Sequence, residues 1–106
     1  MMKLYIGSKG PVAAALAVLA ETLGNCTVTG VLESADEVLC TGAHDAIDPL
    51  LAGRRVVLVQ VDKGDQQAVD ALEKNERFKE SLTVVRWAFD ESDGQTMAAF
   101  INHFAQ

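Results

Sequence analysis

The sequence predicts an α/β protein, a three-layer α/β/α sandwich around a mostly parallel, five-stranded sheet. The first observation is Arg54–Lys63, a short apolar run rich in β-branched residues, which is typical of a strand covered on both faces. The second is that helix-like and strand-like patterns alternate before and after this run. The third is size: 106 residues, 49% of them hydrophobic, suit a single domain over residues 1–106.

The first third of the chain predicts a strand, a helix and a second strand. Lys3–Gly7 is strand-like and ends in a turn containing two glycines, after which Pro11 suits the first position of a helix. The helix covers Val12–Leu23 and ends at Gly24-Asn25. Cys26–Val31 has the β-branched content of a second strand.

The next stretch predicts a third strand and a short helix. Leu32–Asp36 is too short for a full crossover helix, so either a single helical turn or a tight reversal is expected there. Glu37–Thr41 is the third strand. A helix follows within residues 42–53, with His44 or Asp45 near its start and Gly53 after its end. Pro49 is expected to keep this helix short or to confine it to residues 49–52.

The last part of the chain predicts two helices and the fifth strand. Asp65 is expected to cap a helix that runs to about Glu80, and Ser81–Trp87 is strand-like. The buried side of that helix is predicted to carry Ala68, Leu72 and Phe78, and its wet side the charge pairs Asp70–Lys74 and Glu73–Arg77. After a polar loop over Asp90–Gly94, a final helix is predicted from the spacing of Met97, Phe100, Ile101 and Phe104.

The order of elements favours one topology. With right-handed crossovers, the strands take the order 2-1-3-4-5 of flavodoxin-like and Rossmann-like sheets. The Arg54–Lys63 strand is expected in the middle of the sheet. Ligands of such sheets bind at the carboxyl ends of the strands, where the winding direction reverses. We therefore expect loops 7–10, 41–45 and 62–65 to form a site.

These three loops combine glycine with hydroxyl and charged side chains, a pattern that suits a small anionic ligand at helix N-termini. The residues predicted to bind it are Ser8, Lys9, Gly10, Thr41, Gly42, His44, Asp45, Asp62 and Lys63.

Each candidate also has a structural interpretation. Lys9 either binds a phosphate or carboxylate or is a solvated turn residue. His44 either acts as a general acid/base, oriented by Asp45 or Asp62, or belongs to a helix-capping turn. Asp62 either carries function or only ends its strand, and Ser8 lacks the G-x-S-x-G context of a nucleophile. The sequence names no cofactor.

Composition excludes several classes. A net charge of −6 argues against a nucleic-acid partner. Cys26 and Cys40 are the only cysteines and show no zinc spacing, so we expect no metal site and two buried thiols in the cytoplasm. No run has the length of a membrane span, and the apolar Pro11–Ala20 is interpreted as part of the fold rather than as a signal segment.

The helix over residues 11–23 is apolar almost all round, which predicts burial on more than one side and therefore a homo-oligomer. The motifs of P-loops, dinucleotide fingerprints and receiver domains are all missing from the strand ends.

One partial resemblance covers about half of the chain. MKLYIGS at the start, Ala35-Asp36 before EVLC, and Ala52–Val59 look like the layout of nucleoside 2-deoxyribosyltransferase-like domains. Such a resemblance implies a related α/β architecture. However, the catalytic Glu of that family has no counterpart, because residues 42–53 offer only His44, Asp45 and Asp48.

Two functional hypotheses follow. The first is a small cytoplasmic binding or interaction domain that associates with itself through the helix over residues 11–23. The alternative is an enzyme or sensor for a small phosphorylated or nucleotide ligand, with Ser8, Lys9, His44 and Asp62 lining the crevice.

Overall fold

The computed structural model describes residues 2–24, 26–87 and 103. Its strands are β1 (Met2–Ile6), β2 (Cys26–Val28), β3 (Glu37–Cys40), β4 (Val56–Gln60) and β5 (Leu82–Arg86); its helices are α1 (Pro11–Leu23), α2 (Ala43–Leu51) and α3 (Gln66–Lys74). The five strands form one sheet in the order β2-β1-β3-β4-β5, and every neighbouring pair is parallel. The predicted fold class and strand order are confirmed.

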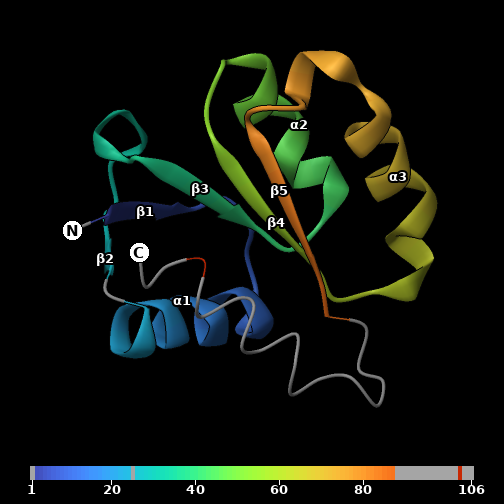
Figure 1. Cartoon of the computed structure of the whole chain (residues 1–106). Coiled ribbons are helices and arrows are strands. Elements are labelled where there is room, and N and C mark those ends of the chain that lie inside the picture. Colours follow the sequence, from blue (N-terminus) through green and yellow to red (C-terminus); the bar gives the residue numbers. More distant parts are fainter. Residues whose placement is uncertain (1, 25, 88–102, 104–106) are drawn as a thin grey trace.

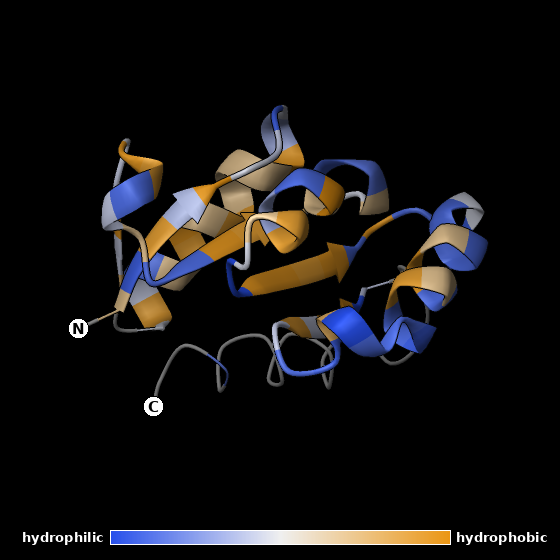
Figure 2. Cartoon of the chain, turned by 90° about the horizontal axis from the view of Figure 1, so that it is seen from above, coloured by the Kyte–Doolittle hydropathy of each residue, from blue (hydrophilic) through white to orange (hydrophobic). Residues whose placement is uncertain are grey.

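The sheet is covered on both faces. The helix α1 lies on one face, and α2 and α3 lie on the other (Figure 1). Because side chains alternate along a strand, each strand contributes to both cores. Toward α1 point Leu39, Val57 and Val59, whereas Val38 and Leu58 point toward α2 and α3. The interior strands stand out as hydrophobic in Figure 2.

The strand β4 is fully buried along its length, as its apolar run predicts. It lies one position from the centre, however, because β3 occupies the middle of the sheet and β5 lies outside β4. A strand buried on both faces, such as β4, therefore need not be the central strand of the sheet.

The connection between β2 and β3 is a helical turn. A 3₁₀ turn, η1 (Leu32–Ser34), follows β2, and β3 then runs parallel to β1, which rules out a tight reversal. The strand β2 is shorter than predicted and ends at Val28, although the N–H of Thr29 still donates to the carbonyl of Leu4 at 2.9 Å.

The helix α2 runs through Pro49 as a short helix of 9 residues, so the prediction that this proline confines it to residues 49–52 is wrong. A proline lacks the N–H that would bond the carbonyl four residues earlier, here that of Asp45. The thiol of Cys40 lies 3.5 Å from that carbonyl oxygen and donates to it instead. The helix ends at Leu51, and Gly53 follows shortly after it, as expected, with a φ of +79° that suits glycine.

The region after β4 is more broken than predicted. A 3₁₀ turn, η2 (Lys63–Asp65), leads into α3, which ends at Lys74 rather than near Glu80. It ends there because the Asn75 side chain accepts the N–H of Arg77 and starts another 3₁₀ turn, η3 (Glu76–Phe78).

The buried side of this region also differs from the prediction. Phe78 and Val69 are buried and Leu72 is partly buried, whereas Ala68 is exposed. The predicted pairs Asp70–Lys74 and Glu73–Arg77 are not the observed ones, since both carboxylates contact Arg86 of β5.

Some expectations concern other parts of the chain. The predicted final helix and the acidic loop over residues 90–93 lie outside the described residues. Cys26 and Cys40 are free and buried, as predicted, on strands that β1 separates. Among the described residues, no helix has the length and apolar character needed to cross a membrane.

Candidate functional site

The carboxyl ends of β1, β3 and β4 meet at one edge of the sheet, because all three strands are parallel. The loops that follow them are joined by side-chain hydrogen bonds, from Ser8 to Asp45 and from Ala43 to Asp65. The predicted meeting of loops 7–10, 41–45 and 62–65 is therefore present. We call this region the carboxyl edge.

Ser8 is the most buried of the predicted site residues and links two of these loops. Its hydroxyl donates to Asp45 Oδ2 at 2.7 Å and accepts the Thr41 N–H at 2.9 Å. Only 7% of the residue is exposed. With its hydrogen bonds made inside the protein, Ser8 holds the end of β1 against the start of α2 and serves a positioning role.

Ser8 reaches this position because Gly7 allows β1 and β3 to approach closely. The Gly7 N–H donates to the Leu39 carbonyl at 2.7 Å. A Cβ at residue 7 would lie 2.8 Å from Val38 Cγ1 and 2.9 Å from Cys40 Sγ, closer than carbon atoms tolerate. Only glycine therefore fits this strand end.

The N-terminus of α2 already holds a carboxylate. Asp65 Oδ2 accepts the Ala43 N–H at 2.8 Å, and the Asp45 carboxylate lies in the same first turn. The expected role of Asp65 as the cap of the following helix is wrong, because its side chain makes no such bond. Helix N-termini attract anions, and here the chain supplies its own.

Cys40 lies beneath this group and is chemically quiet. Burial raises the pKa of its thiol to about 12, and the negative charge of Asp45 adds to this effect. Since the thiolate is the reactive form of cysteine, Cys40 is held as a neutral hydrogen-bond donor. Its role is to satisfy the carbonyl that Pro49 leaves unbonded.

The remaining predicted residues lie around this group on the surface. Lys9, His44 and Lys63 are exposed, and Gly10 precedes α1 with a φ of +108°. Thr41 and Gly42 are partly buried next to Ser8 and Asp65. The prediction that these residues bind a small anion stays a prediction.

Both carboxylates expected to orient His44 make other contacts. Asp45 accepts from Ser8, and Asp62 accepts the Gly64 N–H at 2.8 Å, which shapes its own turn. His44 itself lies in the first turn of α2 and is exposed to solvent. The acid/base and capping-turn interpretations of His44 both stay predictions.

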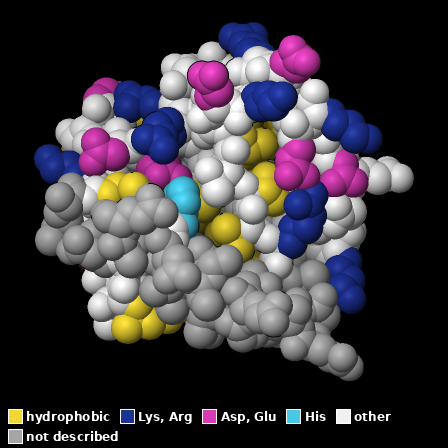
Figure 3. Space-filling view, viewed as in Figure 1, with side chains coloured by type: hydrophobic (Ala, Val, Ile, Leu, Met, Phe, Trp, Pro, Cys, Tyr) yellow, Lys and Arg dark blue, Asp and Glu magenta, His cyan; other side chains and the backbone are white. Residues whose placement is uncertain are grey.

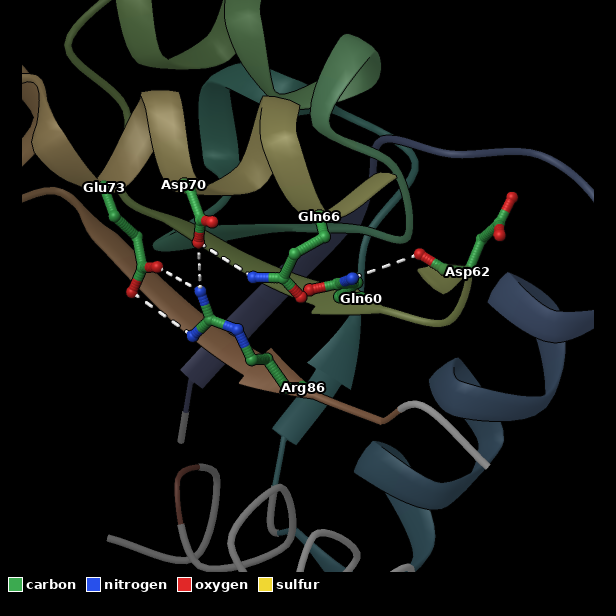
Figure 4. A network of polar contacts seen from close by, with 6 residues as sticks. All are labelled: Gln60, Asp62, Gln66, Asp70, Glu73 and Arg86. Carbon is green, nitrogen blue, oxygen red and sulfur yellow. Dashed lines mark hydrogen bonds and ion pairs between the residues drawn. The ribbon is translucent and has the colours of Figure 1, made fainter. Parts of the chain in front are cut away.

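Sequence reasoning passed over Gln60, the polar residue at the end of β4. Only 1% of it is exposed, and its Nε2 donates to the Asp62 carbonyl at 3.1 Å. In the part of the chain that the structure describes, its Oε1 has no hydrogen-bond partner. Figure 4 shows it beside the polar group formed by Gln66, Asp70, Glu73 and Arg86. The one sign of this buried polar residue in the sequence is a single Gln inside an apolar run.

A second buried polar group lies at the opposite end of the sheet. Glu37, the first residue of β3, is 3% exposed, and its Oε1 lies 2.7 Å from Nε2 of His103. Its Oε2 is buried and has no hydrogen-bond partner among the described residues. His103 is only partly buried, and its contact with Glu37 links it to the start of β3.

An apolar cavity of about 330 Å³ opens between α1 and the ends of β4 and β5. It is lined by Pro11, Val12, Ala15, Leu16, Leu19, Val61 and Trp87. Val61 and Trp87 each follow a strand directly, so the cavity lies at the carboxyl edge on the α1 side of the sheet. The sequence marked both as strand ends but gave no sign of a cavity.

Within the described ranges, no group of three or more His, Cys, Asp or Glu side chains is arranged to hold a metal ion. Comparisons of the chain with protein-family models, with curated proteins and with solved structures find no match. The partial resemblance to nucleoside 2-deoxyribosyltransferase-like domains gains no support from them.

Proposed function

We propose that this chain is a binding domain that associates with a second copy of itself through α1. The observation that carries the proposal is the exposed apolar surface of this helix. Val18 is 60% exposed, Leu23 51% and Val12 41%. Among the described residues these are three of the six large hydrophobic side chains with the greatest exposure, and they lie on one element.

Charge favours α1 as the contact between two copies. Each chain has a net charge of −6, so two copies repel one another over most of their surfaces. From Pro11 to Ala20 the helix has no ionisable side chain, and Glu21 is its one charged residue. Figure 3 shows Lys, Arg, Asp and Glu side chains spread along the upper part of this face, away from α1.

The composition of α1 also permits close packing. The exposed Ala14 lies near Val18 on the outer side, and small side chains let two helices approach closely. Most homodimers have two-fold symmetry, in which the same patch meets itself. A helix without charge can meet its own copy in this way without opposing like charges.

The size of the surface predicts weak association. A helix of 13 residues is about 20 Å long and about 10 Å wide. The resulting contact of a few hundred Å² is well below the ~800 Å² per partner of a standard stable interface. We therefore expect a dimer that forms and dissociates over the micromolar to millimolar range.

Sedimentation equilibrium across that range tests the proposal. Val18→Asp places a carboxylate on the outer side of α1 and is expected to weaken association at least about tenfold. The matched control is Ile47→Asp, which adds the same charge at an exposed aliphatic position of α2. A wild-type chain that stays monomeric at millimolar concentration, or equal effects of both substitutions, contradicts self-association through α1.

The alternative, an enzyme or sensor for a small phosphorylated ligand, has less support. Lys9 and Lys63 are exposed beside the carboxyl edge and would favour an anion, but Asp65 already fills the start of α2. Thermal-shift measurements with nucleotides and sugar phosphates test it, since a bound ligand raises the unfolding temperature. A shift that disappears in Lys9→Ala or His44→Ala would favour this alternative.

We also propose a cytoplasmic location. Its support is the pair of free, buried thiols on strands that are not neighbours, because a reducing compartment preserves such thiols. Thiol counting on protein extracted under denaturing conditions with a blocking reagent tests it. Two blocked thiols are expected, and an oxidised cysteine would count against this location.

A further inference from the structure

We propose that the cavity beside α1 binds a small, uncharged, apolar molecule of about one or two rings. The cavity holds about 330 Å³ between α1 and the ends of β4 and β5. Val12 lines this cavity and also belongs to the exposed apolar surface of α1, whereas Val18 is not one of the lining residues. Substitutions of Val18 therefore distinguish this inference from self-association.

The chemistry of the lining selects the class of ligand. All seven lining residues are Pro, Val, Ala, Leu or Trp, and none carries a charge. A charged or strongly polar molecule would lose its hydration here without gaining a charged partner, which is costly. An apolar molecule gains about 25 cal/mol for each Å² that it removes from water.

The volume selects the size of the ligand. An apolar cavity of about 150 Å³ stays dry and takes up benzene in a well-studied engineered protein. The present cavity is roughly twice as large and lies at the lower end of the range of about 300–1,000 Å³ found for ligand sites. It suits one or two fused or linked rings, or an aliphatic chain of similar volume.

The position of the cavity is that of a ligand site in this fold. Open α/β sheets bind ligands at the carboxyl ends of their strands. On the α2 side of that edge, Ser8 binds Asp45 and Asp65 binds Ala43, so the chain fills the space itself. On the α1 side, Val61 and Trp87 follow β4 and β5 and line open space.

Trp87 makes the proposal directly measurable, because it is the only tryptophan in the chain. The probe is 6-propionyl-2-(dimethylamino)naphthalene, an uncharged molecule with two fused rings whose absorption overlaps tryptophan emission. Bound in the cavity, it would lie against Trp87 and receive its excitation energy. We expect saturable binding with one probe per chain and quenching of Trp87 in step with probe emission.

Two alanines of α1 provide a matched pair of variants. Ala15 lines the cavity, whereas Ala14 is equally accessible on another side of the same helix. Ala15→Leu fills the space and is expected to weaken probe binding at least about tenfold, with Ala14→Leu unchanged. Ala15→Asp and Ala14→Asp repeat the comparison with a charge, and circular dichroism confirms that each variant is folded.

The outcomes separate the possible occupants. Saturable transfer from Trp87 that only the Ala15 substitutions abolish supports the proposal. Non-saturable binding, or equal binding by Ala14→Leu and Ala15→Leu, overturns it, because the probe would then bind exposed apolar surface in general. If Ala15→Leu instead reduces sedimentation-detected association, a side chain of the second copy occupies the cavity and the proposal is wrong. Val18→Asp should leave probe binding unchanged whether or not the chain self-associates.

Discussion

The two helical layers of this protein each bury one face of the sheet but differ in the surface that they expose to the outside. The outer surface of α3 is polar: Gln66 donates to Asp70, and Arg86 of β5 pairs with Asp70 and Glu73 (Figure 4). The outer surface of α1 is apolar, with Glu21 as its one charge.

The interior does not explain this difference. Every residue of β4 is buried, and the two cores are built from the same kinds of aliphatic side chains. Selection for a folded core alone therefore gives no reason for exposed valines on α1. A surface that meets a partner, beside a cavity that takes a ligand, does give one.

The largest expected effects compare one core leucine from each layer. Leu50 of α2 is enclosed, and Leu50→Ala should leave a closed cavity and cost about 3–5 kcal/mol of unfolding free energy. Leu16 of α1 lines the existing cavity, so Leu16→Ala only enlarges it and should cost about 2–3 kcal/mol. Urea unfolding measures both values. A larger loss for Leu16→Ala would contradict an open α1 side.

The next comparison uses the two cysteines, which face opposite layers. Cys40→Ala removes the donor to the Asp45 carbonyl and should cost about 1–3 kcal/mol. Cys26→Ala removes a buried thiol without such a bond and should cost about 1 kcal/mol. Equal losses in urea unfolding would show that the Cys40 hydrogen bond has no net value.

A double-mutant cycle with Pro49 isolates that bond. Pro49→Ala restores an N–H four residues after Asp45, so the carbonyl gains an ordinary helical partner. In this background the cost of Cys40→Ala should fall by about 1 kcal/mol. Additive losses would mean that the thiol and residue 49 do not share the carbonyl.

The thiols also predict how stability depends on alkaline pH. Burial raises the pKa of Cys40 to about 12 and that of Cys26 in the same direction. Below about pH 8.5 both are protonated in the folded and unfolded states and contribute no pH dependence. Above it, the unfolded chain releases protons that the folded chain keeps, so stability falls with rising pH, by up to about 1.4 kcal/mol per unit and thiol.

Urea unfolding at pH 8, 9 and 10 tests this sign. Because the wild-type chain has both thiols, Cys40→Ala should have a shallower decline, and the two curves should converge as pH rises. A wild-type slope that Cys40→Ala leaves unchanged would contradict a strongly raised pKa. At the lower end of that range, the native protein should also react slowly with thiol reagents, since the thiolate is scarce in both sites.

The strand order was predictable because it depends on local pattern. A run such as Val56–Val59 reads as a strand wherever it lies, and short connections with right-handed crossovers leave few topologies. Glycine-rich strand ends identified the carboxyl edge for the same reason.

What failed depends on distant partners. Pro49 is tolerated because Cys40 supplies a donor, and Asp65 turns to Ala43, 22 residues away, instead of capping its own helix. The local sequence shows which hydrogen bonds a residue can make, but it does not show which distant residue is the partner. The cavity beside α1 is of this kind too, since Ala15 and Trp87 meet only in the folded chain.

The smallest expected effect concerns the polar network of the α3 layer. Arg86, Asp70 and Glu73 each have about 40% of their side chains exposed, so water screens their attraction. Arg86→Met should cost less than about 1 kcal/mol, and the loss should shrink as salt is added. The control is Lys79→Met, an exposed residue in the same layer, with the same change of charge. If both variants lose the same stability at every salt concentration, the ion pairs of Arg86 add nothing beyond their effect on net charge. The polar surface of the α3 layer would then serve solubility and would not stabilise the fold.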